Sequence, residues 1–390
     1  MIFVTLDNKN WCKGVYTQGK LHFDNLPQDL SGTWKYAPYL SDRRVSYASL
    51  YTNGKSIEEI CPAHLEDEWK TRKDKLKAYH NSFLEAKVDL QENCFFDLVP
   101  KQFLMELCET KTKIIEYVFG NFEKPKNYDC LLGIEKIITE IAEKNLNLDL
   151  SVLKNNLHDT RARLLLSKLK EAKQISYNLF GSKTGRLTTN PKTFPILNLD
   201  SKYRSVIRPN NDAFLEIDFN AAEIRVLLAL SGEKQPEGDI HLWNSKRIGC
   251  TREQAKTDIF AWLYGSKQVD SKKYENIFGL NKILERYYDG TQIRNPYGRA
   301  IKADDFHKTN YLIQSTANDM VLEQIVKINK LLEAKKSYIS FMVHDSVLID
   351  LAKEDKTLVK ELIKQFSVTR FGTLPVNVSI GKDYGSLRKV

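Results

Sequence analysis

The first 65 residues contain short runs of β-branched and aromatic side chains, which are typical of β-strands. Gly, Asn, Asp and Pro separate these runs, as expected for turns. The runs are IFVTL, GVYT, KLHF, GTWKYAPYL and VSYASLY. We therefore expect a small β-rich module over residues 1–65.

From about residue 66 to residue 180 the apolar positions recur with the period of an α-helix. In FLMELCETKTKIIEYVF they fall on one stripe, and Gly120 is expected to end this helix. Two more helices are predicted in IEKIITEIAEK and RARLLLSKLKEAKQI. The second of these has cations beside its apolar face, a pattern typical of a solvated helix surface: Arg161, Arg163, Lys168, Lys170 and Lys173.

After Gly181 predicted strands and helices mix, which indicates an α+β fold. AFLEIDF predicts a buried strand, and AAEIRVLLALSG predicts a following helix that ends at Gly232. YISFMVHDSVLID, at residues 338–350, predicts a β-hairpin with a polar tip. Two predicted strand ends therefore each present an aspartate, Asp218 and Asp345.

The composition is that of an ordinary globular protein. The 390 residues are 42% hydrophobic and 28% charged, which excludes collagen-like, low-complexity and wholly disordered chains. The balance of 59 Lys and Arg against 50 Asp and Glu gives a net charge of +9, a mild bias toward polyanions such as nucleic acid. No apolar run is long enough to cross a membrane, and Asp7 interrupts the N-terminal segment before a signal sequence could form. We expect a soluble, cytoplasmic protein that is not secreted and has no membrane partner.

The cysteines give no sign of a metal site or a disulfide framework. They form no C-x-x-C pair and have no His pair nearby. We expect them to be reduced packing residues: Cys12, Cys61, Cys94, Cys108, Cys130 and Cys250.

Asp218 and Asp345 are the first candidates for chemistry. An unpaired carboxylate at the end of an apolar strand costs several kcal/mol to desolvate. Two such carboxylates side by side would repel each other, and a pair of divalent ions, with Mg²⁺ favoured by hard oxygen ligands, would relieve the repulsion. Two ions about 3.5–4 Å apart can stabilise the attacking and leaving oxygens of an in-line phosphoryl transfer. Taken singly, each aspartate is also typical of a turn or a helix cap.

A second candidate is the segment TREQAKTDIFAWLYG, in which Arg252, Lys256, Phe260 and Tyr264 recur at four-residue intervals. On an α-helix these side chains lie on one face, cations at one end and aromatic rings at the other. The stripe suits a nucleoside triphosphate, whose phosphates would meet the cations and whose sugar and base would meet the rings. The alternative is an amphipathic helix whose cations extend into solvent.

Six motifs follow one another between Thr184 and Asp345: TGRLTTNP, DFNAAEIR, GDIH, R-x3-K-x3-F-x3-Y-G, NYLIQSTANDM and VHD. Each alone is weakly specific, but together and in this order they resemble the DNA polymerases of the bacterial DNA polymerase I family, family A. The resemblance implies a right-hand fold of palm, fingers and thumb, and a DNA-directed DNA polymerase, a nucleotidyltransferase. The remainder of the chain from about residue 70 fits by size and pattern only.

The resemblance also implies a domain layout. It comprises the β-rich N-terminal module at 1–65, a helical thumb at 66–180, a first part of the palm at 181–235, fingers at 236–314 and a second part of the palm at 315–390. The basic helices of the thumb would hold the duplex backbone without sequence preference. The N-terminal module could be a degenerate remnant, a docking surface for a replication protein or a support for the thumb.

By the same resemblance, Asp218 and Asp345 would bind two Mg²⁺ ions, with the backbone carbonyl of Phe219 as a further ligand. Catalysis is assigned to both aspartates and Lys256. The triphosphate would be bound by Arg252, Lys256 and His241.

The remaining implied roles concern the sugar and the DNA. Glu223 would be a steric gate that crowds a ribose 2′-hydroxyl, Phe260 would lie against the sugar, and Tyr264 would close the pocket near the templating base. The minor-groove side of the primer-template end, which offers acceptors on every base pair, would be contacted by Arg186, Asn310 and Gln314. His344 would touch the primer terminus.

Two positions depart from the family pattern. Ser346 stands where the family commonly has a glutamate, so a third carboxylate near the metals is missing from the motif. Phe306 stands where an arginine is frequent, which removes one expected template contact. His-Asp-Ser also resembles single-subunit phage RNA polymerases, so such an enzyme or a primase is an alternative that Glu223 argues against. A non-catalytic DNA-binding relative is a further alternative, although it would be expected to lose the aspartates or the cationic stripe.

The expected partners are primer-template DNA, dNTPs, and a separate exonuclease or other replication proteins in a bacterial or phage-infected cell. Residues 1–65 are short for a 3′ to 5′ exonuclease domain, and VTLDNKN around Asp7 lacks the paired glutamate such a site needs. We therefore expect no proofreading from this chain.

Overall fold

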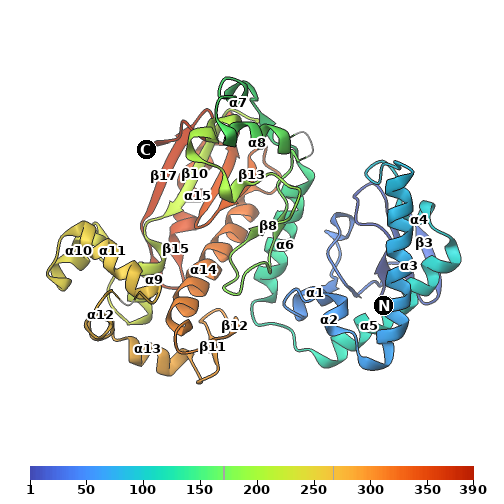
Figure 1. The fold of residues 1–390 in the computed structure, drawn as a ribbon, viewed down its shortest axis with the longest axis horizontal. Helices are drawn as coiled ribbons and strands as arrows, with labels where there is room; N and C mark the ends of the chain where they lie inside the picture. The colour runs from blue at the N-terminus through green and yellow to red at the C-terminus, as the bar shows by residue number, and fades with distance from the viewer. Residues whose placement is uncertain (170–171, 267) are drawn as a thin grey trace. The chain divides into compact units, whose positions relative to one another are not determined.

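The computed structural model describes residues 1–169, 172–266 and 268–390, so Lys170 lies outside the described residues. The chain divides into two units, Met1–Lys136 and Ile137–Val390, and each combines helices with strands. The α+β class predicted from the sequence is confirmed (Figure 1). No helix within the described ranges has the length and apolarity needed to span a bilayer.

The first unit contains a small antiparallel sheet of order β1-β2-β3 beside long helices. Its strands are β1 (Val4–Thr5), β2 (Gly14–Thr17), β3 (Lys20–Phe23), β4 (Gly32–Thr33) and β5 (Ser46–Tyr47). Its helices are α1 (Ala48–Tyr51), α2 (Ile57–Ile60), α3 (Glu66–Glu85), α4 (Phe95–Leu98), α5 (Lys101–Asn121) and the beginning of α6 (Tyr128–Glu143).

Three of the predicted N-terminal strands are confirmed and two are largely wrong. IFVTL, GVYT and KLHF contain β1, β2 and β3. In GTWKYAPYL only β4 is a strand, and a short 3-10 helix begins at Pro38, which has no N–H to donate to a sheet. In VSYASLY only β5 is a strand, because the chain turns into α1 at Ala48. The apolar stripe predicted for α5 is confirmed, since all of its positions are buried in the core of this unit.

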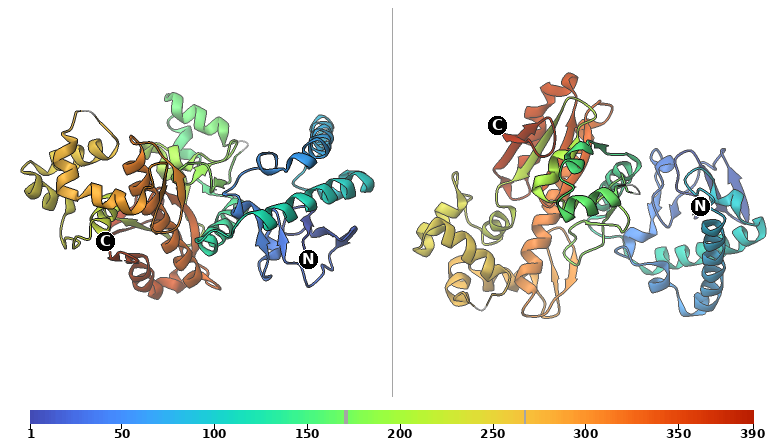
Figure 2. Two further views of the ribbon diagram at one scale, coloured as in Figure 1. Left: turned by 90° about the horizontal axis from the view of Figure 1, so that it is seen from below. Right: turned by 45° about the horizontal axis from the view of Figure 1, so that its top comes forward.

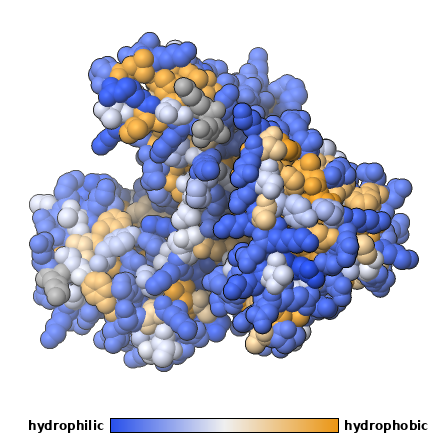
Figure 3. All heavy atoms as spheres, turned by 45° about the vertical axis from the view of Figure 1, so that its right-hand side comes forward, coloured by the Kyte–Doolittle hydropathy of each residue, from blue (hydrophilic) through white to orange (hydrophobic). Residues whose placement is uncertain are grey.

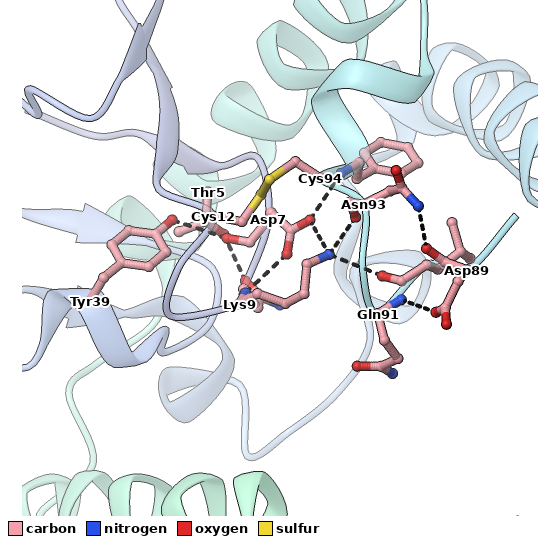
Figure 4. Close-up of polar contacts among 12 residues, drawn as sticks. Thr5, Asp7, Lys9, Cys12, Tyr39, Asp89, Gln91, Asn93 and Cys94 are labelled. Atoms are coloured by element: carbon pink, nitrogen blue, oxygen red, sulfur yellow. Dashed lines mark hydrogen bonds and ion pairs between the residues drawn. A yellow bond between two sulfur atoms is a disulfide. The ribbon is translucent and has the colours of Figure 1, made fainter.

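The expectation that every cysteine is reduced is wrong, because Cys12 and Cys94 form a disulfide (Figure 4). The Asp7 carboxylate accepts hydrogen bonds from the Lys9 ammonium and from the Phe95 backbone N–H, at 2.8 and 3.0 Å. Lys9 also donates to the Leu90 and Asn93 carbonyl oxygens, so that it and Asp7 join the loops of Cys12 and Cys94, which are 82 residues apart in sequence. The sequence spacing of the cysteines carries no trace of this long-range pairing.

The second unit is built on an antiparallel sheet of order β13-β14-β10-β17-β18. Its strands are β6 (Asn147–Leu148), β7 (Tyr177–Asn178), β8 (Thr188–Thr189), β9 (Ile207–Arg208), β10 (Ala213–Phe219), β11 (Gln292–Arg294), β12 (Ala300–Lys302), β13 (Tyr338–Val343), β14 (Ser346–Leu351), β15 (Val368–Thr369), β16 (Gly372–Thr373), β17 (Val376–Gly381) and β18 (Arg388–Lys389). Its helices are α7 (Ser151–Lys154), α8 (Thr160–Lys168), α9 (Ala222–Leu230), α10 (Ile240–Ile248), α11 (Arg252–Leu263), α12 (Ser271–Phe278), α13 (Leu280–Tyr287), α14 (Lys308–Leu332) and α15 (Val359–Ser367).

The central strand β10 and the β13–β14 hairpin form where the sequence predicts them. The β10 side chains alternate, so that Phe219 stacks on Phe366 of α15 at 4.6 Å between ring centroids while Glu216 and Asp218 point to the other face. Helices α10 to α13 form a separate group beside the sheet (Figure 2). Helix α8 is shorter than RARLLLSKLKEAKQI predicts, since it ends at Lys168. The face drawn in Figure 3 is mostly hydrophilic, with scattered apolar patches.

Candidate active site

Asp218 and Asp345 meet at one end of the central sheet. Asp218 of β10 is paired in register with Ser346, the first residue of β14, and Asp345 lies in the turn just before it. Burial and the neighbouring Asp345 raise the pKa of Asp218 from 3.8 to about 7, against a long 3.4 Å hydrogen bond from the Asn377 amide. Burial also raises the pKa of Asp345. The two carboxylates therefore share a corner in which burial outweighs the nearby positive charge of Arg186 and Lys389.

This donor set fits a divalent cation, because a cation would relieve the repulsion between two hard oxygen ligands. In the part of the chain that the structure describes, no group of three or more His, Cys, Asp and Glu side chains is placed to hold a metal. An ion here would therefore take its other ligands from backbone, water or substrate. Phe219 has no oxygen or nitrogen in its side chain, so only its backbone carbonyl could contribute.

The turn after β10 directs Glu223 toward the same corner. Ala221 adopts a left-handed conformation, φ 54°, which is uncommon for a residue other than glycine. The fully buried Arg225 holds this turn, since its Nε donates to the Asn220 carbonyl oxygen at 2.8 Å and its Nη2 to the Asn220 side-chain oxygen at 3.3 Å. Glu223 consequently lies in the first turn of α9 as a buried carboxylate.

Glu223 is held from two sides. The Arg186 guanidinium forms an ion pair with its carboxylate, and the Tyr264 hydroxyl donates to it at 3.2 Å. Burial is the largest influence on Glu223 and raises its pKa, while Arg186 and Tyr264 oppose that rise. Gln314 in turn donates to the Tyr264 hydroxyl at 3.3 Å. The Glu223 side chain is therefore fixed and cannot swing freely.

A pocket of about 180 Å³ opens at this corner. Among the residues that line it are Arg186, Glu223, Phe260, Tyr264, His344 and Asp345. The structure thus brings together six of the site residues predicted from motifs that lie up to 159 positions apart, from Arg186 to Asp345.

The cations predicted to bind phosphate lie outside the pocket lining. Arg252 begins α11 and pairs with Asp239 at 2.7 Å, whereas Lys256 is exposed one turn later. His241 is buried, with its Nδ1 lacking a hydrogen-bond partner among the described residues, and burial lowers its pKa with help from Lys256 and Arg252. The His241 ring lies 6.5 Å from that of Phe260. Tyr264 follows the last residue of α11, so the predicted helical stripe ends one residue early.

The two DNA contacts predicted on α14, Asn310 and Gln314, differ in their surroundings. Gln314 accepts a hydrogen bond from the Thr184 hydroxyl at 2.6 Å, whereas Asn310 lies in the first turn of the helix, outside the pocket lining. Phe306 is 60% exposed, and its ring covers Gly265 so closely that a Cβ there would lie 2.7 Å from it. Phe306 thus packs against Gly265, and an apolar ring stands where the resemblance would place a cation.

Two interactions near the turn at residues 184–186 were not predicted from the sequence. Arg299 donates to Asp319 at 2.7 Å from Nη2, and Asn318 donates to the Gly185 carbonyl at 2.9 Å. Gly185 has φ 82°, and a Cβ there would lie 2.4 Å from the Arg299 guanidinium. A signal was available, because Asn318 and Asp319 are polar residues at buried positions of an apolar helix.

The matches to known proteins are consistent across sequence and structure. The chain is 24% identical over 217 residues to a DNA polymerase of Mycobacterium phage L5, covering 47% of this chain and 36% of that protein. It is 23% identical over 415 aligned positions to DNA polymerase I of Borreliella burgdorferi, covering 82% of this chain and 45% of that protein. The chain thus spans less than half the length of these curated relatives. No protein-family model matches it.

The fold resembles that of a solved polymerase domain. The POL domain of Pol1 from M. smegmatis, in complex with DNA primer-template and dNTP, superposes with a TM-score of 0.67 at 11% identity. The match covers 98% of this chain and 95% of that one. The resemblance to family A DNA polymerases and the polymerase fold predicted from the sequence are confirmed.

Proposed function

We propose that this chain is a template-directed DNA polymerase that adds deoxynucleotides to a primer 3′ end. The observation that carries the proposal is the meeting of Asp218 and Asp345 at one end of the β10–β14 pair, beside a pocket that Asp345, Glu223 and Tyr264 line. The similarity to phage and bacterial DNA polymerases supports the same conclusion.

Asp218 and Asp345 would hold two Mg²⁺ ions, with the Phe219 backbone as a further ligand. When bound, such ions lower the pKa of the attacking hydroxyl and neutralise charge on the triphosphate. Arg252, Lys256 and His241 would bind the phosphates. Arg252 would have to give up its ion pair with Asp239 to do so, whereas Lys256 forms no ion pair in the described part of the chain. The chain's own contribution is positioning and fixed positive charge.

Glu223 would select the sugar. Its carboxylate is pinned between Arg186 and Tyr264, so it would present a rigid obstacle to a 2′-hydroxyl. Phe260 would lie against the sugar and Tyr264 near the templating base. Arg186, Asn310, Gln314 and His344 would contact the primer-template end.

A primer-extension assay tests the proposal. The purified chain is incubated with a labelled primer-template and either dNTPs or rNTPs, with and without Mg²⁺, and Asp218→Ala serves as the control for a contaminating polymerase. We expect Mg²⁺-dependent extension with dNTPs that Asp218→Ala lacks. Extension with rNTPs alone would favour the RNA polymerase or primase alternative, and DNA binding without extension would favour a non-catalytic relative. The domain layout and the lack of proofreading stay predictions.

A further inference from the structure

Glu216 is a third carboxylate on the sheet face that carries Asp218. Along β10, Leu215 and Ile217 are buried while Glu216 and Asp218 are partly exposed. Side chains two residues apart on a strand point to the same face and lie about 6.6 Å apart along it. Glu216 and Asp218 are therefore neighbours.

The strand register places Glu216 beside the turn that carries Asp345. Asp218 faces Ser346 on β14, and Glu216 faces Leu348, so Ser346 is the diagonal neighbour of Glu216. Diagonal neighbours are within reach of a long side chain. The Ser346 hydroxyl accordingly donates to Glu216 Oε1 at 3.4 Å. Three carboxylates thus converge on one corner of the sheet from Glu216, Asp218 and Asp345.

Glu216 is only partly compensated by positive charge, since the nearby Arg204 guanidinium opposes the effect of its burial. No ion pair engages Glu216 within the described residues, and its bond to Ser346 is at the long limit of hydrogen bonding. The nearby Arg204 guanidinium lies 4.9 Å from the centre of the Tyr384 ring, and its buried Nε has no hydrogen-bond partner in the described structure. A half-buried carboxylate in this condition costs free energy unless a cation joins it.

We propose that Glu216 is a third acidic residue beside the divalent-cation site, acting as a positioning residue through its charge and through Ser346. The inference rests on the proposed function, since it adds a residue to the same site. Ser346 occupies the motif position at which the resembled family commonly has a glutamate, so in this chain the third charge comes from the neighbouring strand. Glu216 acts on the cation site without being required as a direct ligand.

The test measures metal binding separately from activity. Mn²⁺ binding is followed by electron paramagnetic resonance on the full chain in complex with a primer-template that ends in a dideoxynucleotide, together with the next dNTP. We expect Glu216→Gln to weaken Mn²⁺ binding about tenfold. Glu216→Gln combined with Ser346→Glu should restore affinity to within about threefold of wild type, because the charge returns to the same corner. Glu354→Gln, which removes an exposed carboxylate paired with Lys336, is the matched control and should change nothing.

Each outcome decides the inference. A Glu216→Gln chain that binds Mn²⁺ as tightly as wild type overturns it. So does a double variant that stays as weak as Glu216→Gln, since the loss would then be structural. Thermal melting of each variant verifies folding, and Glu216→Asp, which keeps the charge, should retain more affinity than Glu216→Gln. Failure of the proposed function is a distinct result, in which wild type itself neither binds Mn²⁺ in this complex nor extends a primer.

Discussion

The two ends of the β10–β14 pair use aspartate in opposite ways. At one end Asp350 is 1% exposed and accepts hydrogen bonds from the Asn210 and Asn211 backbone N–H groups, at 2.7 and 2.9 Å, and from the Tyr338 hydroxyl at 3.0 Å. At the other end Asp218 has a long bond from Asn377 and a raised pKa. The first carboxylate is satisfied by hydrogen bonds, whereas the ionised form of the second is disfavoured by burial and by Asp345. A partly buried acid with a raised pKa and only one long hydrogen bond is therefore the candidate for function.

The strongest test of this contrast removes the unsatisfied acids. We expect Asp218→Ala and Asp345→Ala each to lower single-nucleotide extension about a thousandfold or more, because each removes part of the cation site. Their free energy of unfolding should be unchanged or higher, since a repelling carboxylate is lost. Rapid-quench extension and urea denaturation measure the two effects, with primer-template binding as a control. A variant that retains a tenth of the wild-type rate would exclude that residue from the metal site.

The converse test acts at the satisfied end. We expect Asp350→Ala to lower the free energy of unfolding by about 2–4 kcal/mol, because it leaves buried backbone donors without an acceptor. Extension per folded molecule should stay near wild type. Urea denaturation gives the stability, and extension is measured at a temperature where the variant is folded. If Asp350→Ala abolished chemistry in folded protein, the two ends would not be functionally distinct.

A smaller effect is expected from Glu223, which lines the pocket at the functional end. Glu223→Ala should raise incorporation of rNTPs relative to dNTPs about tenfold, because space opens beside the 2′ position. The ratio of kcat/KM values for one rNTP and its dNTP measures this. Glu233→Ala is a matched control, because it removes a glutamate that is paired with Arg247 outside the pocket lining. An unchanged ratio in Glu223→Ala would place the sugar gate elsewhere.

The smallest expected effect is a pH dependence at the functional end. In metal-free protein the pKa of Asp218 is raised from 3.8 to about 7, so the folded state keeps a proton that the unfolded state has lost. Stability from this group is present below about pH 4 and is lost as the pH rises toward 7. Between pH 4.5 and 7.5 we expect the free energy of unfolding of wild type to fall by on the order of 1 kcal/mol more than that of Asp218→Asn. Urea denaturation in the presence of a chelator measures both proteins. Parallel curves for the two proteins would contradict the raised pKa.

The sequence predicted the strand and the hairpin that carry Asp218 and Asp345 because local signals coincide there. AFLEIDF is a mainly apolar strand with an aspartate next to its last residue, and the polar tip of YISFMVHDSVLID marks the hairpin. What it missed depends on pairing across the chain. Glu216 became a candidate only once register placed it beside Ser346, and the Cys12–Cys94 disulfide depends on loops that Asp7 and Lys9 bring together. The early end of α8 and the start of α1 within a predicted strand show tertiary context overriding local propensity.

The central claim is that Asp218 and Asp345 form the divalent-cation site of a polymerase while Asp350 does not bind metal. A crystal structure of the chain with a dideoxy-terminated primer-template, the next dNTP and Mn²⁺, analysed by anomalous scattering at the manganese edge, tests this most directly. We predict two Mn²⁺ peaks about 3.5–4 Å apart, ligated by Asp218 and Asp345, with none at Asp350. A bound nucleotide with no manganese at either strand-end aspartate would contradict the account.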